Sequence, residues 1–155
     1  MPVNAKSASI VRCPNCGRKN RVPSVASSGT PRCGHCGAPL PWITDGGDDT
    51  FAEIVETSPV PVLVDLWAPW CGPCRTVSPA LETLARDLGG RIKLVKVNVD
   101  DAPDVARRFS IQGIPTLVLM RGKDELARQV GAAPEHALRT WLEGALEAAR
   151  KATPT

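Results

Sequence analysis

The sequence has no apolar run long enough to cross a membrane. Its longest hydrophobic stretches have the length of a strand, whereas a spanning helix needs about 20 apolar residues. Residues 1–12 also lack the hydrophobic segment of a secretory signal, so the expected compartment is the cytoplasm. Hydrophobic residues make up 43% and charged residues 23% of the 155-residue chain, as in globular proteins. This length suits one domain of about a hundred residues with a small module attached.

Acidic residues are absent from residues 1–41, which contain six lysines and arginines. The remainder has 13 basic and 16 acidic residues, so the net charge of +3 conceals an asymmetry. A basic segment of this kind could contact nucleic acid or an acidic partner surface. We favour a local explanation. The same segment contains four cysteines, and four cysteine thiolates bound to one divalent metal ion would carry a net charge of about −2, which nearby lysines and arginines offset.

Residues 11–41 have few large apolar side chains and are rich in cysteine, glycine, proline, arginine and serine. Such a segment cannot build a hydrophobic core, so another interaction must hold it together. We expect residues 1–10 to form a disordered arm and 11–41 a metal-binding module, called here the four-cysteine module. Residues 42–150 would then form the main domain, and residues 151–155 a tail.

The six cysteines form three C-x-x-C pairs, and the first two pairs are separated by 16 residues. This spacing predicts one structural zinc ion with four thiolate ligands, whose binding replaces the missing core as the source of folding energy. A glycine follows each of these first two pairs and suits a turn with positive φ. Two disulfides, free thiols or an iron site are the alternatives, and His35 is expected to be a solvated loop residue. The predicted ligands are Cys13, Cys16, Cys33 and Cys36.

The main domain alternates strand-like and helix-like patterns, with residues 44–50 interpreted as a connection that leads into a short helix over 51–55. Pro79 lies inside the longest early helix and is expected to kink it. The resulting order is β-α-β-α-β-β-α, which predicts an α/β fold with a central mixed sheet and helices on both faces. The further elements are strands over 60–67, 92–99, 115–120 and 125–130 and helices over 71–88, 103–109 and 134–150.

The third cysteine pair, Cys71 and Cys74, lies where an apolar strand meets a helix. Unpaired N–H groups at the helix N-terminus stabilise a thiolate at Cys71, and a thiolate is the species that attacks a disulfide. Cys74, one turn further on, can reach Cys71 and would resolve the resulting mixed disulfide. Half of a metal site is the alternative, but no further pair of ligands remains to complete it.

Three segments resemble the thioredoxin family. Residues 64–75 (VDLWAPWCGPCR) are similar to its active-site segment, residues 111–117 (IQGIPTL) to its cis-proline segment, and residues 130–132 (VGA) to a glycine turn after its last strand. The resemblance covers about residues 42–150 and implies the thioredoxin fold. With the four-cysteine module included, the whole chain resembles the zinc-binding second thioredoxins of bacteria.

The resemblance implies that Cys71 attacks, that Cys74 resolves, and that Asp65 is a buried carboxylate beneath them. The residues agree, because Asp65 is the only charge in the run 60–67, where desolvation would raise its pKa and suit it to proton exchange with Cys74. An Asp at a strand end facing water is the alternative. Lys96 resembles the family's lysine near that carboxylate, although a polar residue of an alternating strand could equally be solvated.

The resemblance also implies a cis peptide bond before Pro115, facing the cysteines. Around it would lie an apolar surface on which an extended client peptide docks. Trp67 is expected to pack beneath the active site, and Trp42 and Trp141 to have structural roles. The residues expected to contact the substrate are Trp70, Gly72, Pro73, Ile114 and Gly131.

Gly72 and Pro73 between the cysteines resemble reducing thioredoxins, whereas oxidising relatives usually carry a histidine there. We therefore expect a monomeric protein-disulfide reductase that acts on disulfide-containing client proteins and is recycled by thioredoxin reductase. Two alternatives remain open: an oxidant on the same fold, and a zinc-ribbon module that binds nucleic acid or a partner protein. No aromatic residue is interleaved with the basic residues of 1–41, which disfavours nucleic acid. Oxidation of the zinc thiolates with release of zinc is a further, regulatory hypothesis.

Overall fold

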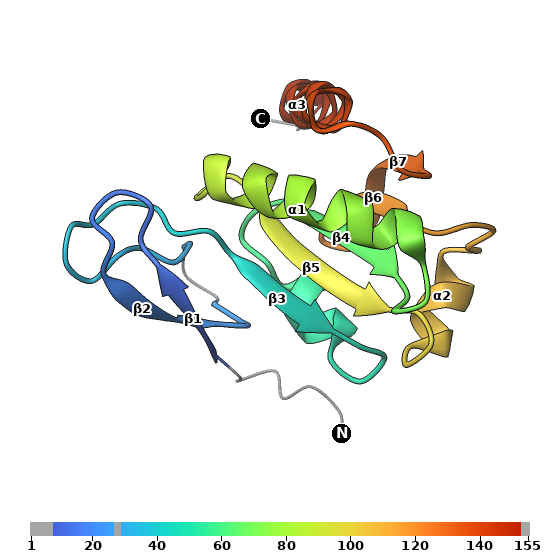
Figure 1. Ribbon diagram of the computed structural model, residues 1–155, viewed down its shortest axis with the longest axis horizontal. Coiled ribbons are helices and arrows are strands. Elements are labelled where there is room, and N and C mark those ends of the chain that lie inside the picture. The colour runs from blue at the N-terminus through green and yellow to red at the C-terminus, as the bar shows by residue number, and fades with distance from the viewer. Residues whose placement is uncertain (1–7, 27–28, 153–155) are drawn as a thin grey trace.

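The computed structural model describes residues 8–26 and 29–152 and contains two sheets (Figure 1). A two-stranded antiparallel sheet pairs β1 (Ala8–Arg12) with β2 (Lys19–Pro23). The disordered arm expected over residues 1–10 overlaps this sheet: residues 8–10 belong to β1, and residues 1–7 lie outside the described residues.

The main sheet has five strands in the order β3-β5-β4-β6-β7. The strands β3, β5 and β4 are parallel, and β6 and β7 continue the sheet in antiparallel fashion. This is the mixed sheet that the sequence predicts. The strands are β3 (Ile43–Gly46), β4 (Val62–Trp67), β5 (Lys93–Asn98), β6 (Thr116–Arg121) and β7 (Asp124–Val130).

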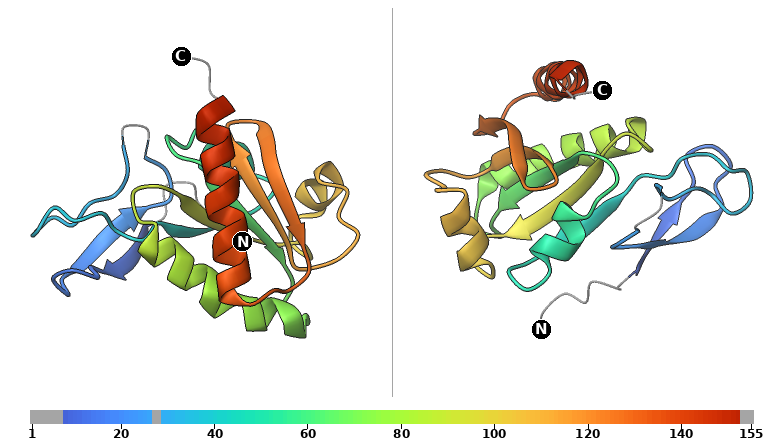
Figure 2. Two further views of the ribbon diagram at one scale, coloured as in Figure 1. Left: turned by 90° about the horizontal axis from the view of Figure 1, so that it is seen from above. Right: turned by 180° about the vertical axis from the view of Figure 1, so that it is seen from behind.

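Helices cover both faces of the main sheet (Figures 1 and 2). The helices α1 (Gly72–Asp87) and α3 (Glu135–Ala152) pack on one face through leucines such as Leu81 and Leu142. The short π-helix η1 (Ala52–Glu56) and α2 (Pro103–Arg108) pack on the other. Alternation along β4 sends Val64 to the η1 face and Asp65 to the α1 face, which places the carboxylate beneath α1.

One further expectation from the sequence needs correction. Residues 43–46 form the edge strand β3, paired with β5, rather than part of a connection. Asp45 and Gly46 are residues typical of turns, so the sequence pattern does not indicate a strand here. The strand forms because it pairs with its parallel partner β5. The start of β5 is also covered: Lys93 is 1% exposed, because the four-cysteine module lies over that end of the strand.

The four-cysteine module lies beside the start of β3, at the N-terminal ends of β3 and β5 (Figure 1). Trp42, just before β3, packs with Val22 and Leu40 in a small separate core. The C-terminal end of β4, by contrast, leads into the segment that contains Cys71. The two cysteine systems therefore occupy opposite ends of the parallel strands. Within the described part of the chain, no helix has the length and apolar character needed to cross a bilayer.

Candidate active site and metal centre

Cys71 and Cys74 form a disulfide at the N-terminus of α1. Cys71 is the N-cap residue, and its Sγ accepts a hydrogen bond from the backbone N–H of Cys74 at 3.1 Å. An N–H at the first turn of a helix, together with the helix dipole, stabilises negative charge on a sulfur held there. Pro73 occupies the first turn, where a missing N–H costs nothing.

The segment before β6 faces the disulfide. The Ile114–Pro115 peptide bond is cis, as the resemblance implies, and the Ile114 carbonyl oxygen lies 3.8 Å from Cys71 Sγ. The Pro115 carbonyl accepts a hydrogen bond from the N–H of Gly131 at 2.8 Å, which joins the cis-proline segment to the end of β7. Gly131 has φ of +91°, a conformation that glycine adopts without strain.

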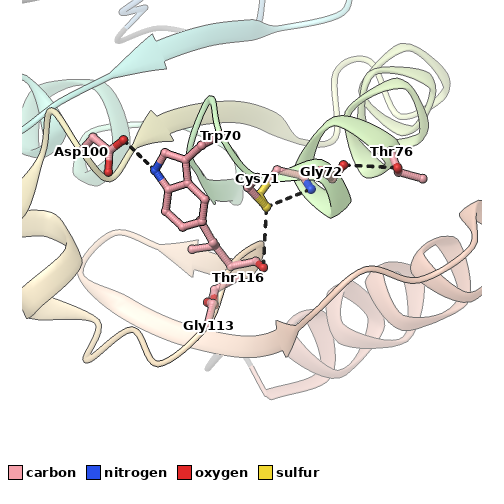
Figure 3. The surroundings of a disulfide bond; sticks show 9 residues. Trp70, Cys71, Gly72, Thr76, Asp100, Gly113 and Thr116 are labelled. Atoms are coloured by element: carbon pink, nitrogen blue, oxygen red, sulfur yellow. Dashed lines mark hydrogen bonds between the residues drawn. A yellow bond between two sulfur atoms is a disulfide. The ribbon is translucent and has the colours of Figure 1, made fainter.

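Trp70 stands exposed beside the disulfide with 67% of its surface accessible. Its indole Nε1 donates a hydrogen bond to Asp100 Oδ2 at 2.9 Å, which fixes the ring next to Cys71 (Figure 3). Val130 is also exposed, and the sequence analysis did not identify it as a surface residue of the site. Its position directly before the Gly131 turn, at the end of β7, was the available signal. Trp70, next to the disulfide, and Val130, next to the turn that contacts the cis-proline segment, are thus both exposed apolar side chains.

Asp65 is buried on the α1 side of the sheet, with 3% of its surface exposed. Burial raises the pKa of its carboxyl to about 6, and the Lys96 ammonium partly opposes this rise. Among the described residues, Asp65 Oδ1 has no hydrogen-bond partner. The direction of this shift is the one expected for a carboxyl inside an apolar strand.

A cavity of about 90 Å³ connects Asp65 to Cys74. Asp65, Cys74 and Lys96 all line it, together with Trp67 and Ser78. Lys96 donates hydrogen bonds to Ser78 Oγ at 2.6 Å and Glu82 Oε1 at 3.1 Å, so its ammonium is held at the cavity's edge. Cys71 faces the Ile114 carbonyl, whereas Cys74 faces this cavity.

The four remaining cysteines lie at the tips of two similar turns. Their Sγ atoms all fall within 4.8 Å of one another, and the pairs Cys13–Cys36 and Cys16–Cys33 are each 3.6 Å apart. Thiolates around a tetrahedral zinc ion, with Zn–S bonds of about 2.3 Å, are separated by roughly 3.8 Å. The sulfurs are thus arranged as a closed metal site requires, and His35 is not part of the cluster.

The turns that present these cysteines have matching geometry. The N–H groups of Gly17 and Gly37 donate to the carbonyls of Cys13 and Cys33 at 2.9 Å, with φ of +81° and +79°. Asn20 Nδ2 lies 3.5 Å from Cys33 Sγ, close enough to donate to a thiolate. Two turns of this form, each with a glycine at positive φ, bring all the sulfurs of the module together as the spacing predicts.

A helix-capping C-x-x-C disulfide opposite a cis-proline, on a mixed sheet covered by helices, defines a thiol–disulfide oxidoreductase. The family model described as thioredoxin matches residues 43–144, and this chain belongs to the thioredoxin family.

The chain is similar to several thioredoxins. It is 49% identical to thioredoxin 1 of Nostoc sp. over 96 residues, which cover 62% of this chain and 90% of that protein. It is 42% identical to thioredoxin of Haemophilus influenzae over 95 residues, covering 61% and 89% of the two chains. Thioredoxin C-3 of Corynebacterium nephridii is 36% identical over 141 residues, covering 89% and 96%. That last similarity extends into the four-cysteine module.

Proposed function

We propose that this protein reduces disulfides in client proteins through Cys71 and Cys74 and is recycled by thioredoxin reductase. The observation that carries the proposal is the Cys71–Cys74 disulfide at the N-terminus of α1, facing the Ile114 carbonyl. Family membership and the named thioredoxin relatives support the same chemistry. We further propose that the protein acts as a cytoplasmic monomer.

Reduction begins when the Cys71 thiolate attacks one sulfur of a client disulfide. A new bond forms between Cys71 and the client, and the second client sulfur leaves as a thiolate that takes up a proton. The helix N-terminus and the Cys74 N–H stabilise the attacking thiolate before this step. The product is a mixed disulfide that still holds the client on the protein.

Cys74 then attacks the sulfur of Cys71 and releases the client as a dithiol. Cys74 must lose its proton first, and Asp65 is the carboxylate on the cavity that both residues line. With a pKa of about 6, Asp65 is ionised at neutral pH, and this pKa is close enough to neutral pH for the carboxylate to accept a proton from Cys74. Two electrons pass to the client, and the protein is left with the disulfide seen in the structure.

The client would dock on the face formed by Trp70, Ile114, Pro115 and Gly131, with Gly72 and Pro73 beside it. The exposure of Trp70 and the position of the Ile114 carbonyl, 3.8 Å from Cys71 Sγ, support this role. An extended peptide aligned along the cis-proline segment would bring its own sulfur to Cys71. Between the cysteines the chain has only Gly72 and Pro73, as in reducing relatives, and no histidine.

We propose that the four clustered cysteines hold one structural zinc ion. The donor set of four sulfurs fits zinc, and a closed shell leaves no position for a substrate. The ion would supply folding energy to a module whose own core consists of few residues, including Val22 and Leu40.

A second candidate role is binding of an acidic partner or nucleic acid by the module. Pairing of β1 with β2 places Arg12 opposite Lys19 and Ile10 opposite Arg21, so these side chains share one face, and Ile10 is exposed. Salt-dependent binding of residues 1–41, within the full chain, to a DNA or RNA oligonucleotide would support this role.

The proposed reductase activity is tested by insulin-disulfide reduction with NADPH and thioredoxin reductase. Wild-type protein is expected to reduce insulin at a rate that depends on both, and Cys71→Ser is expected to be inactive. Cys16→Ser, which removes a thiol of the module, is the matched control and is expected to retain reduction. Activity in Cys71→Ser, or none in the wild type, would contradict the proposal.

A further inference from the structure

Lys93 is buried between the four-cysteine module and the thioredoxin domain. It is the first residue of β5 and has 1% of its surface exposed. Its Nζ donates one hydrogen bond to the carbonyl of Ser24, just after β2, and another at 2.7 Å to the carbonyl of Ile54 in η1. A single ammonium group therefore joins a carbonyl of the module to a carbonyl of the catalytic domain.

Trp42 covers this ammonium and connects it to the cysteine cluster. Lys93 Nζ lies 4.2 Å from the centroid of the Trp42 ring, a cation–π distance. The ring is held in place by a hydrogen bond of 2.8 Å from its Nε1 to the Pro23 carbonyl. Its remaining surface packs in the same core as Cys13 and Cys33. The side chain of Trp42 thus contacts Lys93 and also belongs to a core that includes two of the expected metal ligands.

The burial of Lys93 is costly and needs an explanation. Among the described residues, no carboxylate lies within ion-pair distance of its Nζ, and burial lowers the pKa of the amine to about 8. An ammonium without a carboxylate partner is tolerated in an interior only where other groups solvate it. Here those groups are two carbonyls and one indole ring, and the Ser24 carbonyl and the Trp42 contact depend on the module's position.

We propose that Lys93 holds the four-cysteine module against the thioredoxin domain and makes this docking depend on the metal. The contacts of Lys93 with Ser24, Trp42 and Ile54 are called here the Lys93 latch. The proposal rests on the metal site proposed above. When the cysteines hold the ion, the module is folded and presents the Ser24 carbonyl to Lys93. When the ion is removed, the module loses its main source of folding energy, and the amine at the start of β5 becomes accessible to solvent. By linkage, loss of the latch must weaken metal binding.

Amine labelling of the full wild-type chain tests the latch without any substitution. Zinc-loaded protein and protein treated with a chelator and a thiol reductant are acetylated with sulfosuccinimidyl acetate, and labelling at each lysine is followed by peptide mass spectrometry. Lys123, exposed in the turn between β6 and β7, is the internal control. In zinc-loaded protein Lys93 is expected to react about a hundredfold more slowly than Lys123, and chelation is expected to remove most of this protection. Rapid labelling of Lys93 with zinc bound, or full protection after chelation, would overturn the latch.

Zinc affinity gives a second, reciprocal test. In Lys93→Met the stem is preserved but both hydrogen bonds to carbonyls are lost, and zinc affinity, measured by competition with a chelating dye, is expected to fall about tenfold or more. Lys123→Met is the matched control and is expected to bind zinc as the wild type does. Unchanged affinity in Lys93→Met, in a wild type that carries about one zinc per chain, contradicts the latch alone. A wild type that binds no zinc contradicts the metal site as well.

Discussion

Asp65 and Cys74 face the same small cavity beneath the active-site disulfide, although one lies on β4 and the other on α1. The carboxyl is buried with one oxygen lacking a partner among the described residues, and its pKa is raised to about 6. A protein gains no stability from such a group when it is ionised. This unfavourable burial is consistent with the role proposed for Asp65, proton exchange with Cys74.

Replacement of Asp65 by Asn is expected to stabilise the oxidised protein at neutral pH. The pKa of the carboxyl is about 6 in the folded state against an ordinary value of 3.8, so the folded state binds the proton more tightly and loses stability as pH rises from about 4 to 6. Above that range the ionised carboxylate lowers the free energy of unfolding by the full amount, roughly 3 kcal/mol, and Asp65→Asn removes this destabilisation. Urea unfolding of both proteins at pH 7 measures the gain.

The same comparison at about pH 3.5 is the control for Asp65→Asn, because Asp65 is then largely protonated in the folded state. The difference in the free energy of unfolding between the two proteins is expected to shrink toward zero. An equal difference at both pH values would show that packing, rather than the carboxylate's charge, is responsible. In the reductase assay, Asp65→Asn is expected to slow release of the client from the mixed disulfide.

Trp70→Ala is expected to impair reduction of proteins more than reduction of small disulfides. The exposed indole, fixed by its hydrogen bond to Asp100, offers a large rigid contact for a client chain. We expect the KM for insulin to rise roughly tenfold, with little change in the rate with a small aromatic disulfide, since loss of one buried aromatic contact costs about 1–2 kcal/mol. An equal loss with both substrates would place Trp70 in the chemistry rather than in docking.

Cys33→Ser is expected to abolish stoichiometric zinc binding and to unfold the four-cysteine module. Cys33 is buried in the same core as Trp42, so the fluorescence of Trp42 is expected to shift toward that of exposed indole. The zinc content, measured by atomic absorption, is expected to fall from about one ion per chain to near zero. Insulin reduction is expected to persist, because the module lies at the start of β3, whereas Cys71 follows the opposite end of the parallel strands, after β4. Retention of a tightly bound zinc in Cys33→Ser would contradict the assigned ligand set.

The sequence predicts the main elements because local patterns determine them. The apolar run ending at Trp67 and the leucine spacing after Cys74 specify a buried strand and an amphipathic helix, and both form as expected. The spacing of the first four cysteines likewise predicts the sulfur cluster. The cis bond before Pro115 follows from the family resemblance alone, since most bonds to proline are trans.

Features that depend on distant parts of the chain were not predictable in the same way. The strand β3 contains turn-forming residues and exists because it pairs with β5. Lys93 has the sequence context of a surface lysine, and only the folded structure brings Ser24, Trp42 and Ile54 around it. Val130 is exposed at the end of β7, where the strand reaches the cis-proline segment. No local pattern contains this information.

The most direct test of the central claim is to capture the mixed disulfide with a client. Reduced Cys74→Ser is mixed with insulin, quenched with acid and examined by non-reducing electrophoresis and mass spectrometry, with Cys71→Ser treated in parallel. The account predicts a covalent adduct through Cys71 in Cys74→Ser that a thiol reductant releases, and no adduct in Cys71→Ser. An adduct through any cysteine of the four-cysteine module, or an adduct in Cys71→Ser alone, would contradict it.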